Sequence, residues 1–443
     1  MRPSANSTGP HFHPSTRPQP PTGRLQQPWA ARRAIATRTR ALWPAERPRR
    51  SRVRATEATL ESVYSSVAGE YQNSVLDDEE FTDDATAVDS FVEIIENAMD
   101  KTNTTRFRAM DQIIRLFRHA YVPDLAQTHK AALCEIAEKG IRRTHDEVTR
   151  ALKLVGVVTL QLGLDVEDVI DPALNSMCAF FSDESQPEEL RATCAEVLGL
   201  CAYFGIYRPT KRQECLHHLR QAWSTMKLSM AQTHLFSASL LAWALLLERC
   251  EADQIEEAIN DSQARLCWYL GSNSIDARVS VGEALAVLHE LAVDNVDEEF
   301  RFANHPQLKA QLEGMAGDSV KYHAKRDKRL QKFTFRQIID AIFNEGVPSS
   351  KVRFNKRETL DVEGCHSKLL YDLLCHMLKG DLNTHLTRNE VLRELFDLGK
   401  TLEEEDALNK NSKAAKTEQK NVFNATSKER NIRRGKQRDK KGF

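Results

Sequence analysis

Apolar and polar positions along this chain repeat with a period of slightly more than forty residues, and every repeat contains a segment with helical spacing. Aligned on their first basic residue, five copies of that segment begin at Arg106, Arg150, Arg191, His234 and Arg278. The steps between them are 44, 41, 43 and 44 residues. A period of this length is typical of armadillo and HEAT arrays, in which each repeat is a pair of helices. The pattern therefore predicts a solenoid of five helix pairs.

The recurring copies carry an apolar stripe, and one copy in the middle is apolar on every side. In the third copy the i, i+4, i+7, i+8, i+11 stripe is formed by Leu190, Cys194, Val197, Leu198 and Cys201. The fourth copy is apolar all round from Leu240 to Leu247, so we expect neighbouring helices to cover it on several sides. This run is less than half of the ~20 apolar residues that span a bilayer, and we predict no membrane segment.

The segments that precede the copies predict the first helix of each pair. They cover residues 88–101, 125–139, 166–181, 209–223 and 254–270. Turn-forming residues separate them from the copies, for example Pro123 with Asp124, Ser182 to Pro187 and Gly271 to Ser274.

The pattern changes after Ala292. A basic stretch from Val320 to Arg336 leads into apolar residues at helical spacing. Two short pieces with β-favouring residues follow at 351–354 and 359–362. Helices are predicted at 367–379 and 388–398, with a turn-like segment at 381–387 between them.

Together these elements predict an all-α fold, which is an armadillo/HEAT-like helical-repeat solenoid with a small C-terminal module and disordered basic tails. We divide the chain into a disordered Arg/Pro-rich segment at 1–62, an acidic linker at 63–87, the armadillo-like helical-repeat domain at 88–345, the C-terminal module at 346–400, and a charged linker with a basic tail at 401–443.

The formal net charge of −1 conceals a strong segregation of charge. Residues 1–54 carry twelve Arg and one acid, and residues 409–443 carry twelve Lys or Arg and three acids. The segment between them has a net charge of −21. An acidic body with two basic ends indicates that polyanions bind to the ends. The acidic strip at 76–84 is interpreted as a solvated linker or as a recognition motif.

The nine cysteines include no Cys-x-x-Cys pair and lie mostly within apolar helical patterns. They predict reduced thiols, and hence a cytoplasmic or nuclear protein. The Arg-rich start of the chain also resembles an organellar transit peptide. On a helical wheel, however, Arg32 falls between Trp29 and Ile35, which argues against import. A basic arm and an over-extended gene start are the other interpretations of this segment.

The chain carries no nucleotide-binding glycine motif, no His-Glu-x-x-His and no Gly-x-Ser-x-Gly. We therefore predict a protein that is not an enzyme, with no cofactor and no small-molecule substrate. Cys365 with His366 and Cys375 with His376 could supply four zinc ligands, but their spacing is not that of ordinary zinc sites. The adjacent His217 and His218 would point about 100° apart on a helix, so a surface role is favoured over a shared ligand.

The basic tail is the main candidate binding site. If Ser427 caps a helix, Arg430, Arg433, Arg434, Arg438 and Lys441 fall within an arc of about 140°. Such a one-sided ladder of cations suits contact with successive phosphates. With Lys436 and Lys440 added, these residues are the predicted contact with structured RNA or a ribosome. A nuclear localisation signal is the alternative.

A second candidate patch contains Lys325, Arg326, Lys328 and Arg329. Its alternative interpretation is the solvated start of a helix.

Several stretches resemble the interferon-related developmental regulator family. They include the apolar segments that begin at Ser239 and Gly282, and the basic segment His323-Ala-Lys-x-Asp-Lys-Arg-x-Gln-Lys. Most specific are Tyr371-Asp372, His385-Leu386, Asn389-Glu390, Leu392-Arg393, Phe396 and Leu398-Gly399, which resemble the small C-terminal module of the family. The resemblance covers roughly residues 85–443, and Cys365 stands where a Trp is expected.

The resemblance implies an armadillo-like, non-enzymatic regulator. The family is implicated both in translational regulation at the ribosome and in transcriptional co-regulation. Our leading hypothesis is a scaffold that binds a ribosome or RNA through its basic C-terminal helix and regulates translation. The alternative is a nuclear transcriptional co-regulator whose solenoid contacts regulatory proteins.

Overall fold

The computed structural model describes residues 90–227, 232–317, 325–355, 357–399 and 428. The chain divides into one unit of residues 1–48 with 424–443 and a second unit of residues 49–423. In the first unit the description is confined to Lys428, which is helical and exposed. All that follows concerns the second unit.

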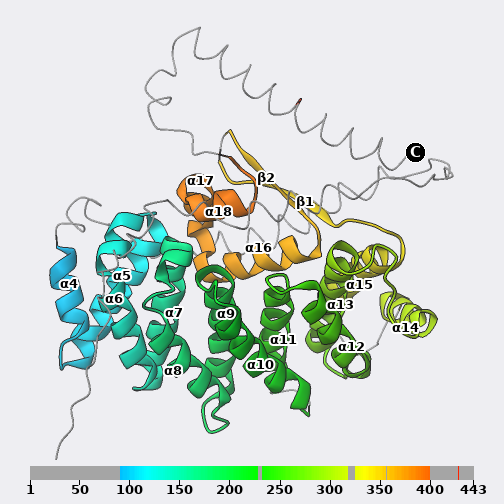
Figure 1. Cartoon of the computed structure of the whole chain (residues 1–443), viewed down its shortest axis with the longest axis horizontal. Helices are drawn as coiled ribbons and strands as arrows, with labels where there is room; N and C mark the ends of the chain where they lie inside the picture. Colours follow the sequence, from blue (N-terminus) through cyan, green and yellow to red (C-terminus); the bar gives the residue numbers. More distant parts are fainter. Residues whose placement is uncertain (1–89, 228–231, 318–324, 356, 400–427, 429–443) are drawn as a thin grey trace, which may run out of the picture. The chain divides into compact units, whose positions relative to one another are not determined.

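Five helix pairs confirm the predicted repeat array (Figure 1). They are α4 (Phe91–Ala98) with α5 (Asn103–His119), α6 (Pro123–Ile141) with α7 (His145–Leu162), α8 (Asp171–Ser182) with α9 (Glu188–Gly205), α10 (Pro209–Thr225) with α11 (Thr233–Leu247), and α12 (Ala252–Tyr269) with α13 (Ile275–Asn295). The odd-numbered helices from α5 to α13 pack against one another in sequence order. They correspond to the recurring copies.

A sixth pair, α14 (His305–Gly317) with α15 (Lys325–Phe343), continues the array because α15 packs against α13. The prediction of five pairs was therefore one pair short. Helix α14 gives little signal in the sequence, since it buries only Leu308, Leu312 and Met315 and contains Gly314 and Gly317. Glycine lowers helix propensity by about 1 kcal/mol per residue.

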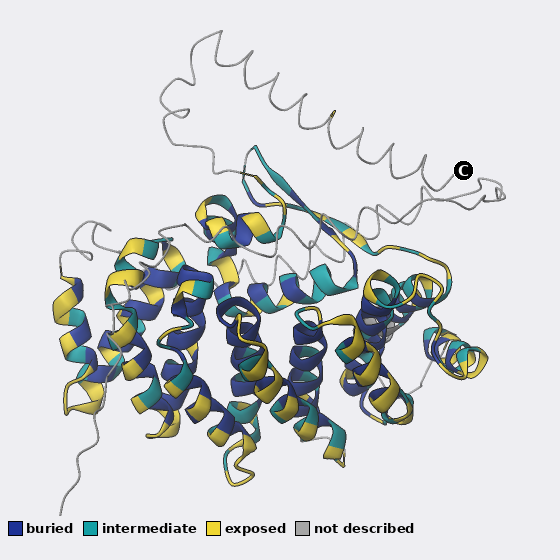
Figure 2. Cartoon of the chain, in the orientation of Figure 1, coloured by how far each residue is buried: buried dark blue, intermediate teal, exposed yellow. Residues whose placement is uncertain are grey.

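The core follows the odd-numbered helices, as their dark colour in Figure 2 shows. Helix α11 buries apolar side chains on almost every side, from Leu235 to Leu247, and this confirms the prediction for the fourth copy. Leu241 is only partly buried. Gly199 of α9 lies against Ala242 of α11, where a Cβ atom would come within 2.7 Å of the alanine Cβ. The two helices therefore pack unusually closely.

In three of the five copies the recurring basic residue binds backbone carbonyls that precede its own helix. Arg106 donates hydrogen bonds to the carbonyls of Asp100 and Lys101, Arg191 to that of Phe181, and Arg278 to that of Ser272. Each arginine thus binds backbone that precedes its own helix, where carbonyl groups lack helical partners. Arg106 also forms a buried, bidentate ion pair with Glu147, with contacts of 2.9 and 2.8 Å.

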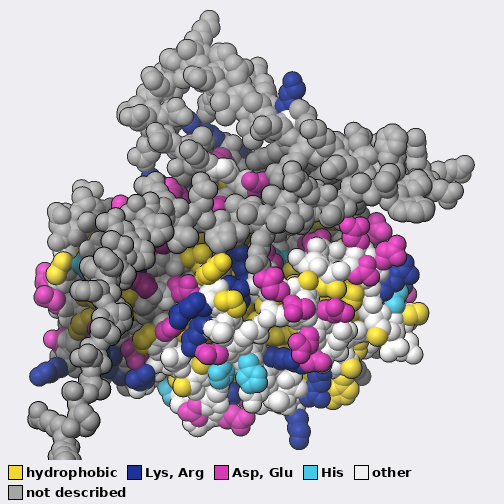
Figure 3. Space-filling model, viewed as in Figure 1, with side chains coloured by type: hydrophobic (Ala, Val, Ile, Leu, Met, Phe, Trp, Pro, Cys, Tyr) yellow, Lys and Arg dark blue, Asp and Glu magenta, His cyan; other side chains and the backbone are white. Residues whose placement is uncertain are grey.

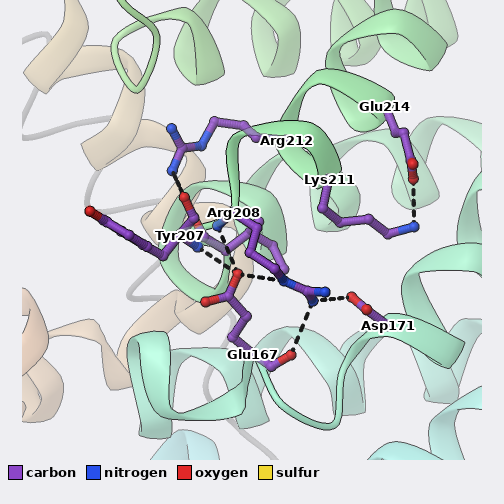
Figure 4. A network of polar contacts seen from close by, with 8 residues as sticks. Glu167, Asp171, Tyr207, Arg208, Lys211, Arg212 and Glu214 are labelled. Carbon is purple, nitrogen blue, oxygen red and sulfur yellow. Dashed lines mark hydrogen bonds and ion pairs between the residues drawn. The ribbon is translucent and has the colours of Figure 1, made fainter.

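Helix α8 begins at Asp171, five residues later than predicted. Gly163, with a φ of +57°, ends α7 and starts a short 3₁₀ turn, η1 (Gly163–Val166). The following corner is held by Glu167, which accepts hydrogen bonds from the backbone N–H groups of Tyr207 and Arg208 and from the guanidinium of Arg208 (Figure 4). Arg208 also contacts Asp171 at 2.7 Å. This network joins adjacent repeats.

In the described residues, the C-terminal module contains a hairpin and four helical elements. Strands β1 (Ser349–Arg353) and β2 (Thr359–Glu363) pair antiparallel, with Lys351 opposite Asp361, and confirm the two extended pieces. They precede α16 (Cys365–Leu378), η2 (Lys379–Asp381), α17 (Leu382–Arg388) and α18 (Glu390–Leu395).

The predicted turn at 381–387 was wrong, because most of it forms α17. The predicted helix at 388–398 is shorter, because the backbone of Asn389 is extended. The Asn389 side chain accepts hydrogen bonds from the N–H groups of Val391 and Leu392 and so caps α18. Among the described helices, none is long and apolar enough to cross a membrane.

Candidate functional site

The C-terminal module lies against the side of the array formed by the odd-numbered helices. Helix α16 packs on α7, α11 and α13 and runs across them in Figure 1. Its side chain His376 also reaches Glu196 on α9. One short helix therefore contacts four repeats, and it covers much of the surface that these repeats share. We take this interface as the candidate functional site because it fixes where the chain after residue 399 begins.

The N-terminal end of α16 is held by two glutamates of α13. The backbone N–H of His366 donates to Oε2 of Glu290 at 2.9 Å, and Lys368 Nζ lies 3.3 Å from Oε1 of Glu283. Burial raises the pKa of the Glu290 carboxyl. A carboxylate at a helix N-terminus also interacts favourably with the helix dipole.

The C-terminal half of α16 is held by a cluster of Glu196, His234 and His376. The Glu196 carboxylate lies 2.9 Å from Nδ1 of His376 and 3.7 Å from Nε2 of His234. His234 also contacts Glu189 at 2.8 Å. The hydrogen bond to Glu196 raises the pKa of both imidazoles, that of His234 to about 9. The cluster therefore joins α9, α11 and α16 through charged groups.

Two fully buried polar side chains of the module bind backbone carbonyls of the array. His385 lies 2.9 Å from the carbonyl of Arg118 through Nε2, and Asn389 donates to the carbonyl of Leu160 at 2.8 Å. The Asn389 amide also lies 3.2 Å from His385 Nδ1, so a neutral ring protonated at Nε2 satisfies both contacts. Burial lowers the pKa of His385 accordingly. These carbonyls belong to the last turns of α5 and α7, which lack helical partners.

Arg393 holds the module together from inside. It is 2% exposed, forms an ion pair with Glu358 at 2.7 Å, and donates to the carbonyls of Leu386, Thr387, Leu398 and Gly399. The contact with Gly399 fixes the last described residue before the C-terminal segment. His385, Asn389 and Arg393 follow an i, i+4, i+8 spacing between buried leucines. This polar row was available in the sequence, but its binding role was not predicted.

Glycines allow the module to approach the array closely. A Cβ atom on Gly156 of α7 would lie 2.9 Å from Cε of Met377, and one on Gly163 would lie 3.1 Å from a methyl group of Val391. The module thus packs against backbone as well as against side chains. Beside Cys365, where the family resemblance leads us to expect Trp, an apolar hollow lies between α13, α15 and α16. It is lined in part by Ala286, Val287, Ile338 and Leu369.

The predicted RNA-binding residues Arg430, Arg433, Arg434, Lys436, Arg438, Lys440 and Lys441 lie outside the described residues. Lys325, Arg326, Lys328 and Arg329 occupy the first turns of α15. The predicted binding role of both groups stays a prediction.

The two Cys-His pairs do not converge on one metal ion. Cys365 and Cys375 stand ten residues apart on the continuous helix α16, about 15 Å along its axis. Within the described ranges, no group of three or more His, Cys, Asp or Glu residues could hold a metal. On the even-numbered side of the array, Nδ1 of His218 lies 3.0 Å from the hydroxyl of Ser182, and His217 is exposed.

Two family models match the chain. Interferon-related developmental regulator (IFRD) matches residues 58–343, and Interferon-related protein conserved region matches residues 389–442. Interferon-related developmental regulator 2 of Mus musculus is 30% identical over 355 residues, which cover 77% of this chain and 80% of that protein. Interferon-related developmental regulator 1 of Homo sapiens is 27% identical over 360 residues, which cover 79% of each chain.

Solved structures with a similar course of the chain are helical-repeat proteins. A designed armadillo repeat protein aligns with a TM-score of 0.40 and 11% identity, over 56% of this chain and 98% of that one. The karyopherin Kap121p bound to the SUMO protease Ulp1p aligns with a TM-score of 0.38 and 14% identity, over 70% of this chain and 33% of that one.

Proposed function

Because the chain belongs to the interferon-related developmental regulator family, we propose that it is a non-enzymatic scaffold that binds a ribosome or structured RNA through its basic C-terminal segment and thereby regulates translation. The seven cations from Arg430 to Lys441 carry the contact. Lys325, Arg326, Lys328 and Arg329 are a second contact of the same kind. The solenoid supplies a rigid support and contacts regulatory proteins.

The observation that supports the proposal is the anchoring of the chain at Gly399, 31 positions before Arg430. His385 and Asn389 fix the module to α5 and α7, and Arg393 fixes the Gly399 carbonyl to the module. The conserved-region match runs from residue 389 to 442, so it includes Asn389, Arg393 and the basic residues.

Sucrose-gradient sedimentation of the tagged full-length chain tests the proposal. We expect the protein to migrate with ribosomes at low salt and to leave them as salt rises, because phosphate contacts release counterions. Deletion of residues 409–443 should move it to the top of the gradient. Unchanged co-migration of the deletion variant would contradict the proposal.

A second candidate function is nuclear co-regulation through protein contacts of the solenoid. Trp268 on α12 is 61% exposed and Tyr207 is 53% exposed, and exposed aromatic residues are enriched where proteins bind one another. A wholly nuclear pool that never sediments with ribosomes would favour this function.

A further inference from the structure

A group of cations gathers where helix α16 ends against the first repeats. It consists of Arg108, Arg115 and Arg118 on α5, Arg150 and Lys153 on α7, and Lys379 in η2. We call it the α5–α7 cationic cluster. On α5 the three arginines and Asp111 fall within an arc of about 80° on an ideal helix, so they share one face. Arg150 and Lys153 are likewise on one face of α7.

The contacts show that the two helix faces and η2 meet. Arg150 Nε lies 3.0 Å from both carboxylate oxygens of Asp111 across α5 and α7. Arg118 contacts Asp381 at 2.9 Å and the carbonyl of Leu378 at 3.1 Å, which joins α5 to the end of α16. The cluster is therefore built from both the array and the module.

Asp111 and Asp381 each pair with one of these cations. In the part of the chain that the structure describes, Arg108, Arg115, Lys153 and Lys379 have no carboxylate partner, and all four are exposed. The pKa of Lys153 is also affected by a neighbouring cation. Partial desolvation, followed by the charge of Lys379, lowers the pKa of the Lys153 ammonium. An anion bound between Lys153 and Lys379 would relieve the repulsion that lowers this pKa.

The backbone at Lys379 supports the same conclusion. Its φ is +52° and its ψ is −128°, a backbone conformation outside the left-handed helical region that residues with a side chain rarely adopt and that costs about 1–3 kcal/mol. Gly380 follows directly, but the lysine occupies the strained position.

The length of the cationic surface matches several successive phosphate groups of one nucleic-acid strand. Arg108 and Arg118 are ten residues apart, about 15 Å along α5, and α7 lies about 8–10 Å away, so the surface is wider than one phosphate group. The exposed aromatic residues of the described surface, Tyr207 and Trp268, lie elsewhere, so base stacking is not provided here. On the face seen in Figure 3, acidic side chains are spread over the body and alternate with Lys and Arg side chains. The cluster thus stands out from a body whose net charge is strongly negative.

We propose that the α5–α7 cationic cluster is a further RNA contact, distinct from the basic segment and from the patch at the start of α15, which binds the phosphodiester backbone of one RNA strand without reading its sequence. This inference rests on the proposed function. It adds a site on the folded body that binds the same RNA molecule as the basic segment. Two linked contacts raise the overall affinity, because the second binding event becomes intramolecular.

The test uses the full-length chain and a fluorescent single-stranded RNA of 20 uridines, with binding followed by anisotropy over a salt series. The variant is Lys153→Glu/Lys379→Glu. We expect its Kd to rise at least about tenfold near 0.1 M salt, and its slope of log K against log salt to become shallower by about 1.4, or 0.7 for each lost phosphate contact. The matched control is Lys227→Glu/Arg301→Glu, which reverses two exposed cations on other repeats and should leave the slope unchanged.

The outcomes separate this inference from the proposed function. Deletion of residues 409–443 tests the basic segment, and the double reversal in that deletion background tests the cluster alone. If the deletion has no effect and the double reversal has a strong one, RNA binding by the basic segment is contradicted and RNA binding by the cluster is supported. An unchanged Kd and slope for a double reversal with wild-type thermal stability would overturn the cluster.

An acidic polypeptide is the competing partner. If a synthetic peptide of residues 76–84 binds the full-length chain and loses binding on the double reversal, while RNA binding does not change, the RNA assignment is overturned.

Discussion

His376 Nδ1 on α16 lies 2.9 Å from Oε2 of Glu196 on α9, and the same carboxylate lies 3.7 Å from Nε2 of His234 on α11. Burial alone would raise the pKa of Glu196, but the hydrogen bonds from the two histidines outweigh it and hold that pKa below its ordinary value of 4.5. Lys379 is a further cation near His376 and slightly opposes the rise of its pKa. The attachment of α16 is therefore dependent on pH.

The sign of this dependence follows from linkage. A histidine whose pKa rises on folding contributes stability that is complete below its unfolded value of 6.5 and is lost as the pH rises through its folded value. Glu196 contributes above 4.5. We expect the thermal midpoint of the wild type to fall more between pH 6.5 and 9 than that of His234→Gln/His376→Gln. Differential scanning fluorimetry measures both profiles.

The effect should be modest, because both imidazoles are about half exposed and such pairs contribute about 1 kcal/mol or less. His385 has the opposite sign, since burial lowers its pKa and its contribution is lost as the pH falls below 6.5. It is unchanged in the double variant and so cancels in the comparison. Parallel profiles from pH 6.5 to 9 would show that Glu196, His234 and His376 do not make the stability depend on pH.

Arg393→Met should destabilise the module by about 3–5 kcal/mol. The change leaves the Glu358 carboxylate and several carbonyls without their buried donor. Arg336→Met, at an exposed position on α15, is the matched control and should cost less than about 0.5 kcal/mol. Urea unfolding gives the free energies, and limited proteolysis after residue 345 reports release of the module. Equal stability of the two variants would show that the buried network is dispensable.

Gly199→Val should destabilise the array by about 1–3 kcal/mol, because its Cβ would come within 2.7 Å of Ala242 Cβ and 3.3 Å of Ala242 Cα. Gly314→Ala in α14 is a control of opposite sign. A Cβ at Gly314 meets nothing within 4 Å, so the higher helix propensity of alanine should stabilise by about 0.5–1 kcal/mol. Thermal unfolding followed by circular dichroism measures both, and a valine variant as stable as the wild type would contradict the close packing of α9 and α11.

Cys365→Trp should stabilise the junction of α13, α15 and α16 by about 1–2 kcal/mol. The larger side chain would fill the hollow lined by Ala286, Val287, Ile338 and Leu369 and bury apolar surface. Cys365→Ala, which leaves the hollow open, is the comparison. A tryptophan variant that unfolds at a lower temperature than the alanine variant would mean that the hollow does not accept the indole.

The repeat array could be predicted because its information is local. Apolar residues such as Ile113, Leu198 and Leu285 recur at one period, and a repeat contacts mainly its neighbours. Helix α14 was missed because its local apolar pattern is weak, with three buried residues and two glycines. The error at residues 381–387 has a different cause. The extended backbone of Asn389 separates α17 from α18. Its side-chain amide donates a hydrogen bond to the carbonyl of Leu160, which is far away in the sequence.

The interface could not be predicted from periodicity for a related reason. Glu196, His234 and His376 carry no shared spacing, and the fold alone brings them together. His385, Asn389 and Arg393 resembled a family motif, but only the structure shows that their buried groups bind carbonyls of α5, α7 and the module. In the sequence, the cations of α5 and α7 look like the ordinary polar faces of two helices. Only the structure shows that Lys379 lies beside them.

The contact between Arg118 and Asp381 joins residues that are 263 positions apart. In a simple solenoid each repeat can finish folding once the next has been made, since its partners are adjacent in the chain. Here the first repeats receive their last neighbours from a module that lies more than 200 residues later in the chain. During synthesis the surface of α7, α9, α11 and α13 therefore stays uncovered until the ribosome has made α16. Newly made chains should depend on chaperones during that interval.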